Sequence, residues 1–101
     1  MSIYLNILKM PEIELYKKIK KSSEEYAKKK GLKLNPDLKR REWVFKGLVE
    51  KKKKLGEFYC PCRVITGNKL EDRKKICPCY WHLAEIKEQG HCLCGLFFKK
   101  N

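Results

Sequence analysis

The stretch YCPCRVITGNKLEDRKKICPCYWHLAEIKEQGHCLCGLFF, residues 59–98, decides how this chain must fold. It holds all six cysteines as three pairs: Cys60-Pro61-Cys62, Cys77-Pro78-Cys79 and Cys92-Leu93-Cys94. A chain of 101 residues buries only a modest core, so a metal or disulfide staple would contribute much of its stability. We expect a single domain over residues 1–101, with helical support from 1–59 and the cysteine chemistry in 60–101.

The cysteines also bear on the cellular compartment. In a secreted chain six cysteines would indicate a disulfide framework with many alternative connectivities. Segment 1–9 does not resemble a secretory signal, because it has no basic start, Asn6 breaks its apolar run and no small-residue cleavage site follows. No apolar run is long enough to span a membrane. We therefore expect a reducing, cytoplasmic setting, where cysteine clusters indicate metal binding or catalysis.

Apolar spacing predicts a mainly α fold made of several short helices, and helix-start and helix-stop residues give its boundaries. The expected elements are helices over 11–30 and 36–55, a helical turn over 70–75, a helix over 81–89 and an apolar tail over 95–98 that packs under the cysteines or lies extended.

Several side chains have expected places in this fold. Asn35 is expected as the N-cap of the second helix, with Pro36 at its first helical position. Leu83 and Ile86 are expected to face inward from the last helix. Large aromatics dominate small cores, so core and shielding positions are expected for Trp43, Tyr80 and Trp81.

The spacing of the cysteines bears on the kind of metal. Zinc sites usually take four ligands presented from Cys-x-x-Cys turns, whereas here each pair has a one-residue gap and there are six thiols. A 4Fe-4S cluster also takes four thiolates, which leaves two cysteines, the number needed for one disulfide. Proline between two cysteines restricts the backbone, so Pro61 and Pro78 make their pairs rigid. The count predicts four ligands plus one disulfide without saying which cysteines are which.

The net charge of +13 suggests a charged partner. Clustered Lys and Arg are typical of nucleic-acid binding, but most of these lysines lie on helical stretches where they solvate an exposed face. We therefore expect no dedicated nucleic-acid site, and an acidic protein is the better partner because complementary charge steers transient encounters. Arg63 and Arg73 flank the cysteine pairs and are candidates to contact such a protein.

Taken in order, the cysteine motifs resemble the catalytic beta chain of ferredoxin:thioredoxin reductase, in its archaeal or bacterial variants. The resemblance extends over most of the chain. It also includes the stretches Glu25-Tyr26-Ala27-Lys28, Gly47-Leu48, Leu55-Gly56, Cys60-Pro61-Cys62-Arg63 and Cys94-Gly95-Leu96-Phe97-Phe98.

The resemblance implies a division of labour among the cysteines. The cluster ligands would be Cys60, Cys77, Cys79 and Cys92. Cys62 and Cys94 would form the active-site disulfide, with Cys62 as the exposed thiol that attacks the partner and Cys94 held against the cluster. It also implies a thin, mainly helical molecule with ferredoxin on one face and the disulfide partner on the other.

This chain departs from the plant-type pattern in its gaps and in one residue. The first gap is two residues shorter, the second is four longer, and Leu93 stands where the plant-type family has histidine. His91 and His82 are candidates to take over the proton handling, since an imidazole near a disulfide can protonate a leaving thiolate. An ordinary surface or packing role is the alternative for each.

The leading hypothesis is an oxidoreductase that passes electrons from ferredoxin, or a similar small iron protein, through a 4Fe-4S cluster and a disulfide to thioredoxin or a glutaredoxin-like protein. A variable subunit is a further candidate partner. The alternative is a non-enzymatic zinc or iron–sulfur module with a basic nucleic-acid-binding surface. A third hypothesis is an electron carrier in which the two remaining thiols have no function.

Overall fold

The computed structural model describes residues 10–100 and is mainly helical, as predicted. The prediction for segment 1–9 lies outside the described residues, and the division of the chain at residue 59 stays a prediction. Not one of the described helices is both long and apolar enough to cross a membrane. In chain order the elements are helix α2 (Met10–Lys30), strand β1 (Leu32–Leu34), helix α3 (Leu38–Leu55), helix α4 (Lys69–Asp72), the 3-10 turn η1 (Arg73–Lys75), helix α5 (His82–Gln89) and strand β2 (Phe97–Lys99).

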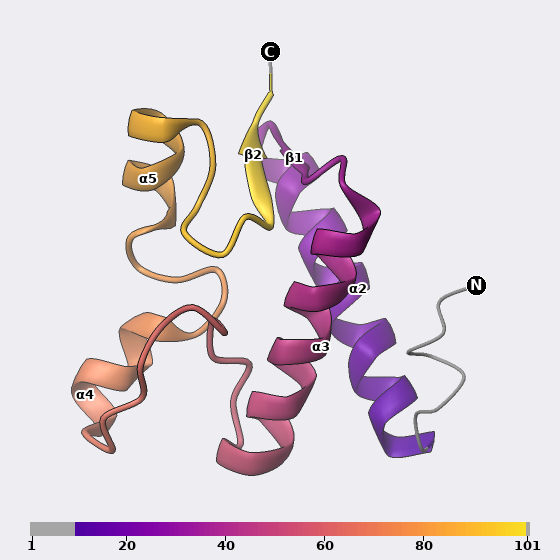
Figure 1. Ribbon diagram of the computed structural model, residues 1–101, viewed down its shortest axis with the longest axis vertical. Helices are drawn as coiled ribbons and strands as arrows, with labels where there is room; N and C mark the ends of the chain where they lie inside the picture. The colour runs from indigo at the N-terminus through magenta and orange to yellow at the C-terminus, as the bar shows by residue number, and fades with distance from the viewer. Residues whose placement is uncertain (1–9, 101) are drawn as a thin grey trace.

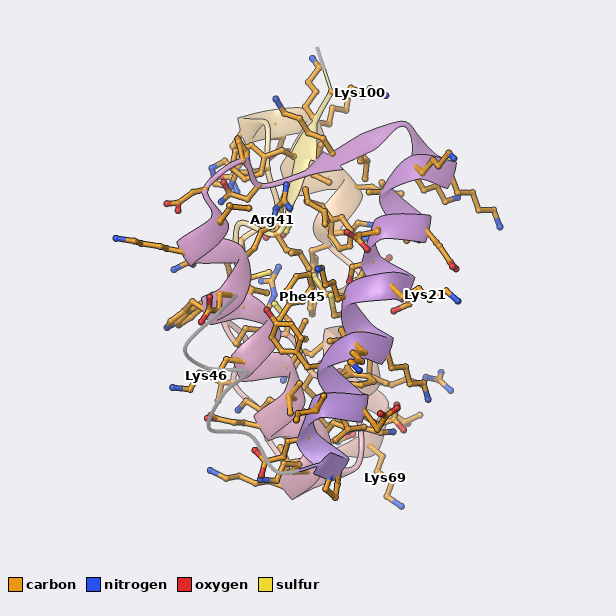
Figure 2. The ribbon with its side chains drawn as sticks, turned by 90° about the vertical axis from the view of Figure 1, so that its right-hand side faces the viewer. Lys21, Arg41, Phe45, Lys46, Lys69 and Lys100 are labelled. Atoms are coloured by element: carbon orange, nitrogen blue, oxygen red, sulfur yellow. The ribbon has the colours of Figure 1, made fainter. Side chains whose placement is uncertain are left out.

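Helices α2 and α3 run antiparallel along one side of the molecule (Figure 1). Tyr16 on α2 meets Phe45 on α3 edge to face, with ring centroids 5.6 Å apart, and Figure 2 shows Phe45 between the two helices. The buried stripe of α3 has helical spacing and consists of Val44, Phe45, Leu48 and Val49. Burying each such side chain stabilises the fold by about 1.5–3 kcal/mol, so this stripe anchors the helix pair.

The start of α3 corrects two predictions. The helix begins at Leu38, so Pro36 is not its first helical residue. Its N-cap is Asp37, whose carboxylate accepts hydrogen bonds from the backbone N–H groups of Lys39 and Arg40. Asn35 does not cap the helix, because its side chain accepts from the Asp37 N–H and donates to the Gly95 carbonyl at 2.8 Å. The Asn35 side chain therefore holds the turn at Gly95, far along the sequence, instead of capping α3.

A two-stranded antiparallel sheet, absent from the predicted elements, closes the fold. Strand β1 pairs with β2, and Leu34 lies opposite Phe97. The apolar tail thus lies extended, one of its two predicted alternatives, and Figure 1 shows β2 between β1 and α5. Each strand has three residues, too few for an alternating pattern to stand out in the sequence.

The exposure of several apolar residues also corrects the sequence analysis. In α5 Ile86 is buried as predicted, but Leu83 is 51% exposed. Trp43 and Tyr80 are 48% and 73% exposed, so the expectation that they belong to the core is wrong. The helix over 81–89 and the helical turn over 70–75 are confirmed by α5 and by α4 with η1.

The molecule is flat, with extents of 37 × 35 × 20 Å, and Figure 1 looks down the shortest of these axes. The three cysteine segments lie in the connections between helices and just before β2.

The turn before α4 depends on one buried carboxylate. Asp72 accepts hydrogen bonds from the backbone N–H groups of Thr66 and Gly67, at 2.9 and 2.8 Å, and forms an ion pair with Lys75 at 3.1 Å. The Thr66 N–H, together with the Lys75 ammonium, lowers the pKa of Asp72 to about 2. A group with a depressed pKa stabilises the fold above its unfolded pKa and loses that stabilisation as the pH falls.

We therefore expect Asp72→Asn to destabilise the protein at neutral pH, and the difference from wild type to shrink as the pH falls from about 4 to about 2. Urea unfolding at a series of pH values measures this. Glu71→Gln, at an exposed neighbouring position, is the matched control and should show no such convergence. A pH-independent difference for Asp72→Asn would contradict the argument.

Candidate functional site

A short backbone bridge brings the first two cysteine pairs together. Tyr59 and Ile76 face each other as an isolated antiparallel bridge. On either side of it, the Cys60 N–H donates to the Lys75 carbonyl at 2.7 Å and the Cys77 N–H donates to the Phe58 carbonyl at 2.8 Å. The first cysteines of both Cys-Pro-Cys motifs therefore lie side by side.

The third pair is held in a tight turn that leads into β2. The Gly95 N–H donates to the Cys92 carbonyl at 2.9 Å, and the Cys92 N–H donates to the Phe97 carbonyl at 3.1 Å. The Asn35 amide ties the same turn to the start of α3 through the Gly95 carbonyl. Three segments far apart in sequence thus present their thiols to one place.

All six cysteines are free thiols, and most are shielded from solvent. Cys60, Cys79, Cys92 and Cys94 are buried, whereas Cys62 and Cys77 are half-buried. The Sγ atoms of Cys92 and Cys94 are 3.7 Å apart. The Cys79 and Cys94 thiols lie close enough to Cys60 to lower its pKa, so thiols from all three pairs interact.

These contacts favour negative charge on two of the thiols. Hydrogen bonds from Cys79 and Cys94 lower the pKa of Cys60, and a hydrogen bond from Cys94 lowers the pKa of Cys92. The same bonds raise the pKa of Cys79 and of Cys94. Burial raises the pKa of Cys77. The thiolate is the form that ligates metal, so the centre already favours it at two of the predicted ligands.

The Arg63 guanidinium lies inside this site and connects its parts. Its Nη2 donates to Glu85 Oε2 at 2.7 Å and lies 3.6 Å from Cys79 Sγ. The other oxygen of Glu85 accepts from the Leu93 N–H at 3.1 Å. The guanidinium also stacks over the Trp81 ring, 4.6 Å from its centroid. The sequence-based suggestion that Arg63 contacts an acidic partner is therefore replaced by an internal role, whereas Arg73 remains exposed.

A second arginine reaches the predicted disulfide pair from α3. Arg40 Nε donates to the Cys94 carbonyl at 3.0 Å, and its Nη2 lies 3.9 Å from Cys62 Sγ. Burial and then charge on Cys60 raise the pKa of Cys62, while the Arg40 guanidinium lowers it. Sequence reasoning missed this residue, because Arg40 lies in a charged helical run that carries no local signal of a site.

The two candidate histidines have different surroundings. His82 is buried: its Nδ1 donates to the Cys79 carbonyl, which leaves Nε2 to accept from the Tyr26 hydroxyl at 2.6 Å. This is a packing role behind Cys79. His91 donates from Nδ1 to the Cys92 carbonyl at 2.8 Å and stacks on Phe98. Within residues 10–100 no hydrogen bond joins its ring to a sulfur, so its catalytic role stays a prediction.

A test of the donor set shows that these residues fit an iron–sulfur cluster. Its predicted ligands already receive hydrogen bonds at sulfur, from Arg63 to Cys79 and from the Phe97 N–H to Cys92 at 3.4 Å. Arg63 Nε is buried and has no acceptor among the described residues, so it is a donor that an anionic cluster could use. Within residues 10–100 no three His, Cys, Asp or Glu side chains converge on a single metal ion. Cluster thiolates bind different iron atoms and need no such convergence.

A flat helical domain that gathers six free thiols and two arginines at one site defines a thiol-based redox or iron–sulfur protein. The sequence profile described as "Ferredoxin thioredoxin reductase catalytic beta chain" matches residues 10–101. The chain belongs to this family, as the cysteine motifs predicted.

Relatives with curated descriptions agree with this assignment. The chain is 36% identical over 81 residues to the chloroplastic ferredoxin-thioredoxin reductase catalytic chain of Spinacia oleracea, and 35% identical over 81 residues to the catalytic chain of Porphyra purpurea. These matches cover 78% of this chain, but 52% and 65% of the two relatives. The chain therefore spans about half to two thirds of the length of these relatives.

The first Cys-Pro-Cys motif rests directly on α3. A Cβ built on Gly47 would lie 2.7 Å from Pro61 Cβ, closer than real Cβ contacts allow. Alanine would raise helix propensity by about 1 kcal/mol, but overpacking typically costs about 1–3 kcal/mol. We expect Gly47→Ala to lower stability, and Pro61→Gly in the same chain to recover part of the loss. Thermal unfolding of the wild type, the two single variants and the double variant measures the coupling free energy between the two positions. A Gly47→Ala protein more stable than the wild type would show that Pro61 can move aside at little cost.

The Glu85 carboxylate serves both Arg63 and the third cysteine turn. Glu85→Gln keeps the shape but removes the charge opposite Arg63, so we expect a loss of about 1–3 kcal/mol in unfolding free energy and faster alkylation of Cys79. Glu88→Gln on the same helix, at an exposed position, is the control and should change stability by less than about 0.5 kcal/mol. Equal effects of the two changes would exclude a special role for Glu85.

Proposed function

We propose that this chain is an iron–sulfur disulfide reductase. It takes electrons from ferredoxin, or a similar small iron protein, and delivers them to the disulfide of thioredoxin or a glutaredoxin-like protein. The observation that supports this most directly is the meeting of six free thiols from three segments, four of them buried, in a chain of this family.

In this proposal Cys60, Cys77, Cys79 and Cys92 hold a 4Fe-4S cluster. The donors around Cys79 and Cys92 support the assignment, because hydrogen bonds to sulfur stabilise a ligating thiolate. A cluster bound there would supply electrons one at a time. Arg63 would orient Cys79, and the Phe97 N–H would hold the Cys92 sulfur.

Cys62 and Cys94 carry out the thiol–disulfide exchange. The Cys62 thiolate attacks one sulfur of the partner's disulfide, so that the S–S bond breaks and the other sulfur leaves as a thiolate. Cys94 then attacks the Cys62 sulfur, which forms the Cys62–Cys94 disulfide and releases the partner in its dithiol form. The cysteine pair has lost two electrons and the partner has gained two. Half-burial of Cys62 leaves it within reach, and Arg40 contacts both members of the pair.

Three finer parts of the proposal concern protons, partners and compartment. His91 is the candidate proton donor. Because the relatives are named as catalytic chains, we propose that a variable subunit is a candidate partner. The spinach relative is described as chloroplastic, and for this chain we propose the cytoplasm, where its thiols would stay reduced.

We expect the purified protein to be brown and to contain about four irons and four acid-labile sulfides per chain. Cys62→Ser and Cys94→Ser should each keep the cluster and lose disulfide reductase activity, whereas Cys60→Ser should impair cluster assembly. Iron and sulfide analysis, visible absorption and a thioredoxin-reduction assay measure these outcomes. Loss of the cluster in Cys62→Ser or Cys94→Ser would overturn the ligand assignment. A colourless zinc protein would instead favour the non-enzymatic module.

A further inference from the structure

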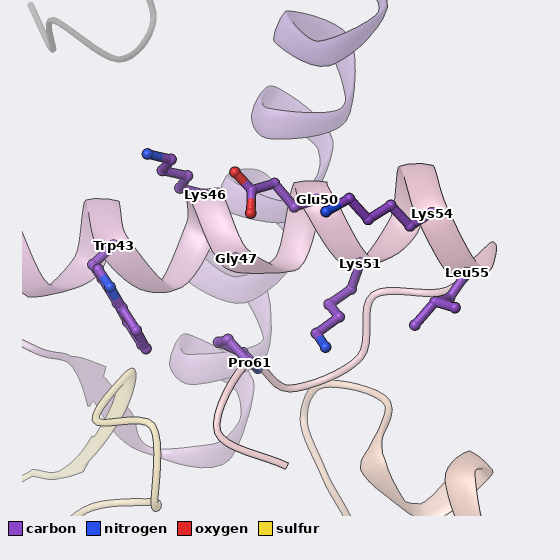
Figure 3. Close-up of a pocket in the computed structure, with 8 residues that line it drawn as sticks. All are labelled: Trp43, Lys46, Gly47, Glu50, Lys51, Lys54, Leu55 and Pro61. Carbon is purple, nitrogen blue, oxygen red and sulfur yellow. The ribbon is translucent and has the colours of Figure 1, made fainter. Parts of the chain in front are cut away.

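A groove beside the first cysteine pair is not used by the chemistry described above. It has a volume of about 450 Å³, within the range of pockets that bind small ligands or a few residues of peptide. Figure 3 shows it along α3, with Pro61 facing the helix near Gly47. Its lining consists of Trp43, Lys46, Gly47, Glu50, Lys51, Lys54, Leu55 and Pro61.

One residue that lines the groove is the direct chain neighbour of Cys62. This residue is Pro61, which precedes Cys62 in the chain. At the same end, the Arg40 guanidinium lies over the Trp43 ring, 4.3 Å from its centroid, and reaches to 3.9 Å from Cys62 Sγ. A polypeptide lying in this groove would therefore reach Cys62 at its Trp43 end.

The inner wall of the groove is apolar and open to solvent. Trp43 and Leu55 are 48% and 47% exposed, and Pro61 is half-buried between them. In Figure 3 the side chains of Trp43 and Leu55 point to the side of α3 on which Pro61 lies. Exposed aromatic and aliphatic groups of this kind are typical of surfaces that bind another protein.

The charges around the groove are mainly positive. Lys46, Lys51 and Lys54 contribute three ammonium groups against the single carboxylate of Glu50. Figure 3 shows Lys51 pointing from α3 to the side on which Pro61 lies, whereas the Lys54 side chain runs along the helix toward Glu50. An apolar groove with this surrounding charge is complementary to an acidic segment.

We propose that this groove binds an acidic, extended segment that flanks the disulfide of the partner protein, and so selects which disulfides Cys62 attacks. This rests on the proposed function, because it takes Cys62 as the attacking thiol. Pro61, the residue before Cys62, meets α3 at Gly47. Lys51 and Lys54 lie about 6 and about 10 Å along the helix from that point. An extended chain advances about 3.3 Å per residue, so the acidic residues belong roughly two to three positions from the partner's cysteine.

The test uses the cluster-loaded Cys94→Ser protein and two synthetic peptides. Each peptide carries one cysteine activated as a 2-thiopyridyl disulfide; one has Glu, the other Lys, at the second and third positions from it. Attack by the Cys62 thiolate forms a peptide mixed disulfide and releases thiopyridine, which absorbs light and gives the rate. We expect the Glu peptide to react about ten-fold faster or more at low salt, and the difference to shrink at high salt.

Charge reversal separates this groove from the overall charge of the protein. Lys51→Glu together with Lys54→Glu should remove the preference for the Glu peptide. The matched control, Lys18→Glu together with Lys21→Glu on α2, changes the net charge equally at exposed positions outside the groove and should keep the preference. Figure 2 shows Lys21 on α2.

The possible failures are distinguishable. Equal rates for the two peptides, or an equal loss in the control protein, would overturn the groove proposal while leaving Cys62 as the attacking thiol. Peptide mapping that finds the mixed disulfide on another cysteine would overturn the proposed function itself.

Discussion

The ion pair between Arg63 and Glu85 is the contact on which the shared site depends. Arg63 follows the first cysteine pair and reaches the sulfur of Cys79 in the second, while Glu85 accepts the N–H of Leu93 in the third. Both charged side chains are largely shielded, at 18% and 20% exposed, so each would be costly to leave unpaired. Each cysteine pair is therefore held relative to the other two, although no regular sheet or long helix joins them.

The helical half of the chain gives this site a rigid support. The buried stripe of α3 packs on α2. At Gly47, the lack of a side chain lets Pro61 pack directly against the backbone of α3. The sheet of β1 and β2 then fixes the turn that carries Cys92 and Cys94. The helices and the small sheet thus position the segments that carry the thiols, and the Arg63–Glu85 ion pair links these segments to one another.

The surroundings of the thiols differ in a way that matches the division of labour proposed for them. The Arg63 guanidinium donates to the Cys79 sulfur and the Phe97 N–H to the Cys92 sulfur, whereas Cys62 is half-buried beside Arg40 and follows Pro61 of the α3 groove. Leu93 takes the place of the plant-type histidine, and its backbone N–H is used to bind Glu85. The charged group nearest the proposed disulfide pair among the contacts described is accordingly an arginine from α3.

Local patterns in the sequence determined the helices, the three cysteine pairs and, through their order, the family. Periodicity and capping residues are local properties, which is why the elements over 11–30, 70–75 and 81–89 were predicted nearly to the residue. Tertiary contacts decided the rest. Asn35 does not form the expected cap, because its side chain bonds the Gly95 carbonyl instead. Trp43 is exposed beside the groove and not part of the core. The roles of Arg40, Arg63 and Glu85 depend on sulfur or ion-pair contacts with partners at least 16 residues away, so no spacing in the sequence could reveal them.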